Sequence, residues 1–105
     1  MSFPYPAAEA VKGRVLGALL RGELLTHLDC WRRFGSSRLS HHVWALRRLG
    51  WPVQMMETTV RTSDAGRPAQ IGRYYLTSDS IGEAGEEGQR YAAEAAAVEL
   101  ERRAA

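Results

Sequence analysis

Apolar positions between residues 24 and 53 predict two short helices folded about a tight turn. Thr26 precedes a helical run, and Asp29 lies three residues after Thr26. This is the spacing of a capping box, in which both side chains satisfy free amides of the first turn. The bulky apolar positions expected in this helix are Leu28, Trp31 and Phe34. Gly35 is expected to end this helix, because glycine readily adopts the left-handed conformation that ends helices.

A second helix is expected over residues 37–49, started by Ser36 or Ser37 as a cap. Its apolar residues recur at i, i+4 and i+7 and form one buried face: Leu39, Val43 and Leu46. Gly50 ends the helix and Pro52 prevents its restart. The opposite face carries Ser37, His41, Trp44 and Arg48, with Arg38 beside them. Two such helices about a glycine turn form a helix-turn-helix.

Before this unit, the prolines of residues 1–6 predict an extended arm. Residues 7–21 have the apolar spacing of a helix. Gly13 and Gly17 weaken that helix by about 1 kcal/mol each relative to alanine, so packing must hold it. Residues 23–25 are long enough for one short strand before the Thr26 cap.

After Pro52, residues 53–60 and 69–77 are rich in β-branched and aromatic side chains. The polar, turn-rich segment 61–68 separates them, which predicts an antiparallel hairpin with a long loop. Three helices, a short strand and a hairpin predict an α+β fold, the winged helix-turn-helix, over residues 7–78.

Residues 79–105 are rich in alanine and glutamate and favour an acidic helix from about Glu86. Its narrow apolar stripe consists of Tyr91, Ala95 and Val98. The stripe fits the body of the domain or a second copy of the chain, in a homodimer through residues 83–103. A solvated single helix is the alternative.

The chain resembles the small helix-turn-helix (winged-helix) domain family common in phages and prophages, over about residues 12–77. The matching positions are Leu25, Thr26, Leu28, Asp29, Cys30, Phe34, Gly35, Arg38, Leu39, Ser40, Val43, Leu46, Arg47, Gly50, Pro52, Val53, Arg73, Tyr74 and Leu76. Cys30 replaces the usual alanine, and the acidic C-terminal helix lies outside the pattern. The resemblance implies DNA binding.

Charge is segregated along the chain although the net charge is only +2. Residues 10–50 carry eight Lys and Arg against two Asp and Glu, a net +6. Residues after Thr77 carry seven acids against three arginines, a net −4. A basic head and an acidic tail suggest a face that binds polyanions and a separate interaction element.

The candidate DNA contacts lie mainly on the second helix of the helix-turn-helix. They are Ser36, Ser37, Arg38, His41, Trp44 and Arg48, which can reach base edges or phosphates from the major groove. Arg38 can equally hold the turn. Trp44 is expected to face outward, as an edge-of-core residue, a DNA contact or a protein contact.

Arg67 lies between Gly66 and Pro68 at the expected hairpin tip. A tip of this type can enter a narrow minor groove or meet phosphate. A solvated loop is the alternative.

Other classes of function find little support. His27, Cys30, His41 and His42 lack the two closely spaced ligand pairs typical of zinc sites, so we expect Cys30 to be a small buried thiol. No catalytic constellation stands out, so we expect neither an enzyme nor a cofactor. No apolar run approaches the about 18 residues of a membrane span, and we expect no membrane partner. A single cysteine and the lack of a secretion signal indicate a reducing cytoplasm.

Two hypotheses follow. The first is a dimeric DNA-binding transcription regulator or excisionase-like factor of phage or mobile-element origin, with residues 37–49 in the major groove and residues 61–68 on the backbone or minor groove. The alternative is a winged-helix protein-interaction module, a phage inhibitor or adaptor. It would act through the acidic helix and two exposed tryptophans, Trp44 and Trp51. The net positive charge of residues 10–50 favours the first hypothesis, DNA binding.

Overall fold

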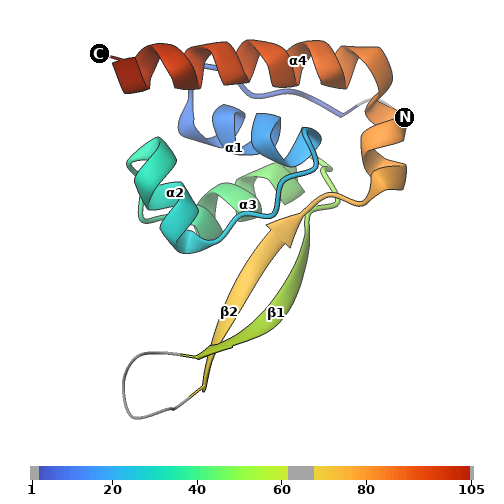
Figure 1. Cartoon of the computed structure of the whole chain (residues 1–105). Coiled ribbons are helices and arrows are strands. Elements are labelled where there is room, and N and C mark those ends of the chain that lie inside the picture. Colours follow the sequence, from blue (N-terminus) through green and yellow to red (C-terminus); the bar gives the residue numbers. More distant parts are fainter. Residues whose placement is uncertain (1–2, 62–67, 105) are drawn as a thin grey trace.

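The computed structural model of the protein describes residues 3–61 and 68–104. The chain order is α1 (Val11–Leu20), α2 (His27–Phe34), α3 (Leu39–Arg48), β1 (Gln54–Arg61), β2 (Pro68–Tyr75) and α4 (Ser78–Ala104). The first three helices cluster together, the hairpin projects from them, and α4 lies across α1 on the side away from α3 (Figure 1). The predicted α+β winged helix with a C-terminal helix is confirmed.

The start and end of α2 follow the predicted local signals. Thr26 Oγ1 accepts a hydrogen bond from the Asp29 amide at 3.2 Å, and the Thr26 amide donates to Asp29 Oδ2 at 2.9 Å. Gly35 ends the helix in the left-handed conformation with φ 68°.

The buried face of α2 excludes two of its bulky apolar residues. Leu28 and Trp31 are 52% and 58% exposed, whereas Cys30 and Phe34 are buried. Cys30 and Phe34 lie one helical turn apart on the side that meets α1 and α3. The expectation that Cys30 is a small buried thiol is confirmed. The bulky side chains of Leu28 and Trp31 do not contribute to the buried face, because the thiol occupies the side that packs.

Close packing holds α1 despite its two glycines, as expected. A Cβ on Gly17 would lie 2.4 Å from Ala95 Cβ of α4, and a Cβ on Gly13 would lie 2.1 Å from the carbonyl oxygen of Ala7. The helix begins at Val11 instead of residue 7, because residues 7–10 form a turn in which the Ala10 amide donates to Ala7 O.

The predicted buried face of α3 is confirmed, since Leu39, Val43 and Leu46 are at most 1% exposed. The helix is shorter than predicted at both ends. Its N-cap residue is Arg38, and no side chain caps the first turn. The prediction of a serine cap was therefore wrong in detail.

The wing is an antiparallel pair in which Gln54 faces Tyr75 at the base and Arg61 faces Pro68 at the outer end. The predicted third strand is a single bridging residue: Leu25 and Tyr74 exchange two backbone hydrogen bonds of 2.9 and 2.8 Å. Arg47 Nε donates to the carbonyl oxygen of Val53 and so ties α3 to the start of the wing. Most of the predicted loop lies outside the described residues.

The C-terminal helix begins at Ser78, eight residues before the predicted start near Glu86, and contains a non-helical residue at Gly85 (φ 61°, ψ −147°). Tyr91 and Ala95 are buried in the core, and Val98 packs against it. Of the expected alternatives for this stripe, the structure places it on the body of the domain. A thin stripe suffices because Gly17 lets α1 approach closely.

The N-terminal residues also join the core. The rings of Phe3 and Tyr5 lie 5.3 and 5.1 Å from the Trp51 ring, whose Nε1 donates to the carbonyl oxygen of Pro4 at 2.8 Å. Trp51 is therefore only 2% exposed, and the expectation that it is a surface tryptophan was wrong. Across residues 3–61 and 68–104, no helix has both the length and the hydrophobicity needed to span a bilayer.

Candidate nucleic-acid interface

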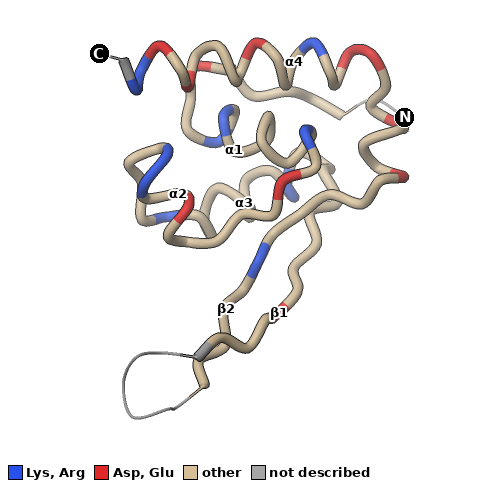
Figure 2. The backbone as a smooth tube through the Cα atoms, viewed as in Figure 1, with Lys and Arg blue, Asp and Glu red and all other residues tan. Residues whose placement is uncertain are grey.

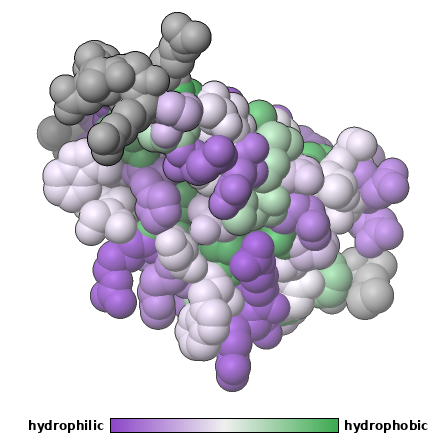
Figure 3. Space-filling model, turned by 90° about the horizontal axis from the view of Figure 1, so that it is seen from below, coloured by the Kyte–Doolittle hydropathy of each residue, from purple (hydrophilic) through white to green (hydrophobic). Residues whose placement is uncertain are grey.

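The outer face of α3 carries most of the predicted contact residues. Because Leu39, Val43 and Leu46 turn inward, most other positions of the helix face away from the core, while His42 and Ala45 are half-buried. The exposed residues on α3 and just before it are Ser37, Arg38, Ser40, His41, Trp44, Arg47 and Arg48. Seen from below, hydrophilic side chains dominate the molecule, with smaller hydrophobic areas between them (Figure 3). The tertiary structure thus keeps five predicted residues (Ser37, Arg38, His41, Trp44 and Arg48) on one accessible face.

Three of these side chains form a stacked row along α3. The His41 ring stacks on Trp44 with centroids 5.7 Å apart, and the Arg48 guanidinium lies 5.3 Å from the Trp44 centroid. Such a cation–π contact contributes about 0.5–1 kcal/mol at an exposed site and limits the positions that Arg48 samples. Trp44 is 55% exposed, so the expected edge-of-core role was wrong and its outward orientation is confirmed.

Ser36 has a different position from Ser37. Its hydroxyl accepts a hydrogen bond from the Arg38 amide at 3.2 Å and lies 3.0 Å from His42 Nε2. Burial lowers the pKa of His42, and the nearby His41, Arg38 and Lys12 lower it further. Ser36 and His42 thus hold the turn before α3, while the Ser37 side chain has no hydrogen-bond partner among the described residues.

The N-terminus of α3 lacks a side-chain cap. No described residue accepts a hydrogen bond from the amides of Leu39, Ser40 and His41, the first three residues of the helix. Free amides and the positive end of a helix dipole suit a phosphate oxygen.

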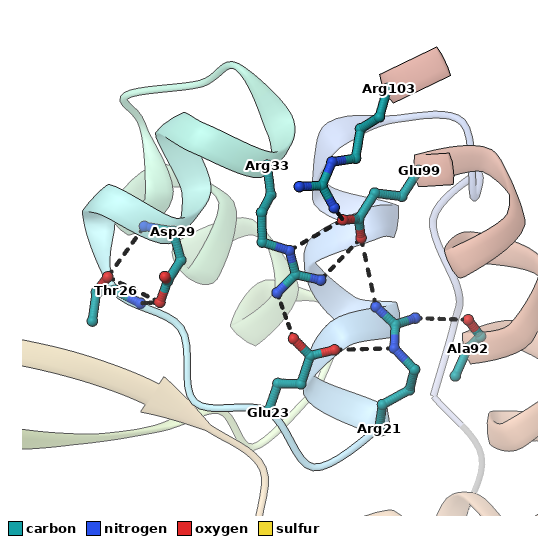
Figure 4. A network of polar contacts seen from close by, with 8 residues as sticks. All are labelled: Arg21, Glu23, Thr26, Asp29, Arg33, Ala92, Glu99 and Arg103. Carbon is teal, nitrogen blue, oxygen red and sulfur yellow. Dashed lines mark hydrogen bonds and ion pairs between the residues drawn. The ribbon is translucent and has the colours of Figure 1, made fainter. Parts of the chain in front are cut away.

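The basic head presents fewer free charges than its sequence suggests. Arg33 Nε and Nη2 donate to the two oxygens of Glu99 at 3.1 and 3.0 Å, and Arg33 also pairs with Glu23 (Figure 4). Arg21 Nε donates to Glu23 at 3.1 Å, and Arg21 Nη1 donates to the carbonyl oxygen of Ala92 at 2.8 Å. These contacts use two arginines within the monomer, so the net +6 overstated the basic surface.

The structure adds residues that sequence reasoning missed. Lys12 of α1 borders a shallow pocket together with His41 and His42, so this exposed lysine lies at the edge of the α3 face. Ser40 is exposed in the first turn of α3. Only its match to the family pattern drew attention to Ser40. Lys12 gave a weak signal, as one charge in a helix that is otherwise largely buried.

The wing extends beyond the helical cluster on the side away from α4 (Figure 1). Its strands are paired along all eight positions of β1, from Gln54 to Arg61. Arg67, the predicted contact at the wing tip, lies outside the described residues. Within the described part of the chain, no three His, Cys, Asp or Glu side chains are grouped so that they could hold a metal ion.

A family model described as a winged helix-turn-helix domain matches residues 11–79. The match covers more than half of the chain, from the first residue of α1 to the second residue of α4. The chain belongs to this family. Winged helix-turn-helix domains are typically non-enzymatic DNA-binding modules, and α3 occupies the place of their recognition helix. Nearly all of α4 lies outside the matched region. No curated protein and no solved structure gives a significant match to the chain.

Proposed function

We propose that this winged helix-turn-helix protein binds duplex DNA with α3 in the major groove. The observation that carries the proposal is the outer face of α3. Arg38, His41 and Arg48 are exposed there, and their side chains have no hydrogen-bond partner among the described residues. Cationic and polar side chains without internal hydrogen bonds can bind phosphates and base edges without first breaking a hydrogen bond within the protein.

The geometry suggests that residues at the start of α3 and residues further along it contact different parts of the DNA. Ser37, Arg38 and the free amides of the first turn would hold phosphate, because they gather at the positive end of α3. His41 and Arg48 would reach the groove, with Trp44 between them as a stacking platform. Ser36 would contribute by holding the turn, since its hydroxyl is engaged by Arg38 and His42.

Residues 61–68 of the wing would meet the backbone or the minor groove, with Arg67 as the inserted side chain. A role as a transcription regulator or excisionase-like factor of a phage or mobile element is the finer form of the proposal. A homodimer through residues 83–103 stays a prediction. It would need the outer face of α4, where Leu100 is 71% exposed, because Tyr91 and Ala95 are buried. A monomer mass in light scattering would contradict it.

A protein-interaction module is the second candidate. It is favoured by Trp31 and Trp44, which are both more than half exposed, and by the exposed acidic residues of α4 (Figure 2). Large exposed aromatic side chains are typical of protein interfaces. Trp51 no longer supports this candidate, because it is buried.

Fluorescence anisotropy on random duplex DNA at several salt concentrations tests the proposal. We expect micromolar binding that weakens steeply with salt, because bound lysines and arginines release counterions from DNA. Arg38→Ala should reduce the slope of log affinity against log salt by about one unit, because the proposal places Arg38 on phosphate. Arg90→Ala, which removes an exposed arginine of α4, is the matched control and should leave the slope unchanged. Absence of binding even at low salt would refute DNA binding and put the protein-interaction module first.

A further inference from the structure

A pocket of about 500 Å³ lies where the C-terminal ends of α2 and α4 meet α1. Five of its lining residues are arginines: Arg14, Arg32, Arg33, Arg102 and Arg103. Basic segments of α1, α2 and the end of α4 gather at this end of the molecule (Figure 2). The pocket is distinct from the outer face of α3, which contributes none of its lining residues.

The positive charge in this pocket exceeds the negative charge beside it. Arg33 pairs with Glu99 and Glu23, and Arg103 lies 3.3 Å from Glu99. Arg14, Arg32 and Arg102 form no ion pair with any described residue. At least three guanidinium groups therefore border the pocket without an ion pair to a described residue.

The excess of positive charge costs free energy at Arg14, because this guanidinium is buried. The residue is only 6% exposed, and its Nε is shielded from solvent without a hydrogen-bond partner. Its guanidinium lies 5.9 Å from the centroid of the Phe34 ring, a contact that supplies no acceptor. Burial lowers the pKa of Arg14, and the charge of Arg102 lowers it further. A guanidinium nevertheless stays protonated, so a buried donor that is charged and unpaired remains.

We propose that this pocket binds a phosphate-type oxyanion. Guanidinium groups present planar pairs of N–H donors that match phosphate oxygens, and several of them around one anion bind it more tightly than one alone. The pocket is larger than a single phosphate group, which suits a ligand carrying two linked phosphates. The phosphate can belong to a free small molecule or to a DNA backbone.

The first arm of the test is calorimetric titration of the full chain with pyrophosphate at constant ionic strength. We expect saturable binding that Arg102→Gln weakens by roughly tenfold, the effect of one charged hydrogen bond. Arg102 is exposed, so this substitution leaves the core intact. Arg90→Gln is the matched control, because Arg90 is an exposed arginine of the same helix that does not line the pocket. It should bind pyrophosphate as the unchanged protein does.

The second arm separates the two sources of phosphate, with the same variants titrated on random duplex DNA. Pyrophosphate binding that Arg102→Gln weakens assigns the site to a free ligand, whether or not the protein binds DNA. If pyrophosphate does not bind but Arg102→Gln lowers DNA affinity by more than Arg90→Gln does, the phosphate is that of the DNA backbone. If Arg102→Gln and Arg90→Gln behave alike toward both probes, the proposal is overturned.

Discussion

The turn before α3 depends on two side chains, one backbone amide and one glycine. Gly35 adopts φ 68°, a conformation that residues with a Cβ rarely adopt. The Ser36 hydroxyl links the Arg38 amide to His42. Burial lowers the pKa of His42, so the ring is neutral near pH 7 and its Nε2 can accept a hydrogen bond from the Ser36 hydroxyl. The position of Arg38 at the entrance of α3 therefore depends on a titratable group.

This arrangement predicts a pH dependence of stability. The unfolded chain, with a histidine pKa of about 6.5, takes up a proton at a higher pH than folded His42 does. Stability should therefore fall as the pH drops from about 6.5 toward the lower pKa of the folded state. His42→Gln should flatten the dependence between pH 7.5 and 5.5, measured by urea unfolding. His27→Gln, at an exposed histidine, is the control, and equal flattening by both would contradict the assignment.

Among the helices, α1 and α4 make the most extensive contact. Gly17 faces Ala95 so tightly that an added Cβ would lie 2.4 Å from the alanine methyl carbon. Tyr91 of α4 also holds the segment before α1, because its hydroxyl donates to the carbonyl oxygen of Pro6 at 2.7 Å. The helix outside the family match is thus packed into the same core as the matched domain.

Gly17→Ala should destabilise the protein by about 1–3 kcal/mol, because overpacking forces α1 and α4 apart. The substitution gains about 1 kcal/mol of helix propensity, so the packing cost has to exceed that gain. Gly82→Ala is the matched control. A Cβ there meets nothing within 4 Å, and the free energy of unfolding should rise by up to about 1 kcal/mol. If denaturation shows that both variants are stabilised, the contact is looser than described.

At the scale of the whole molecule, Glu99 joins three helices. Its side chain is only 8% exposed and binds Arg33 of α2, while Arg21, just after α1, lies 3.7 Å from it (Figure 4). The bonds to Glu99 raise the pKa of Arg33 against the effect of burial. Although burial raises the pKa of Glu23, its bonds to Arg33 and Arg21 lower it overall. The charged form of each carboxylate and guanidinium in this network is thus stabilised by the oppositely charged groups around it.

Glu99→Gln should cost about 2 kcal/mol of stability, because it leaves three guanidinium groups (Arg21, Arg33 and Arg103) with one carboxylate fewer. The value is below the about 3–5 kcal/mol of fully buried pairs, since Arg21 and Arg33 keep 25% and 21% exposure. Glu101→Gln, at an exposed position of the same helix, should change the free energy of unfolding by less than about 0.5 kcal/mol. Equal midpoints in urea for the two variants would show that the network contributes little.

The sequence by itself determined the features that depend on near neighbours. The Thr26 capping box, the left-handed stop at Gly35 and the buried stripe of α3 each involve residues within about two helical turns. The outward orientation of the α3 face follows from that stripe. Local spacing therefore predicted the architecture and which residues of α3 are exposed on its outer face.

Only the tertiary structure decided which of several similar residues are free. Glu99 neutralises Arg33 from 66 residues away, and Phe3 with Tyr5 covers Trp51. The helical spacing places Trp44 outward, but nothing in the local pattern shows that Trp51 is buried or distinguishes Arg33 from the unpaired Arg32. Burial and charge pairing depend on which distant segments meet, and that is settled by the packing of the whole chain.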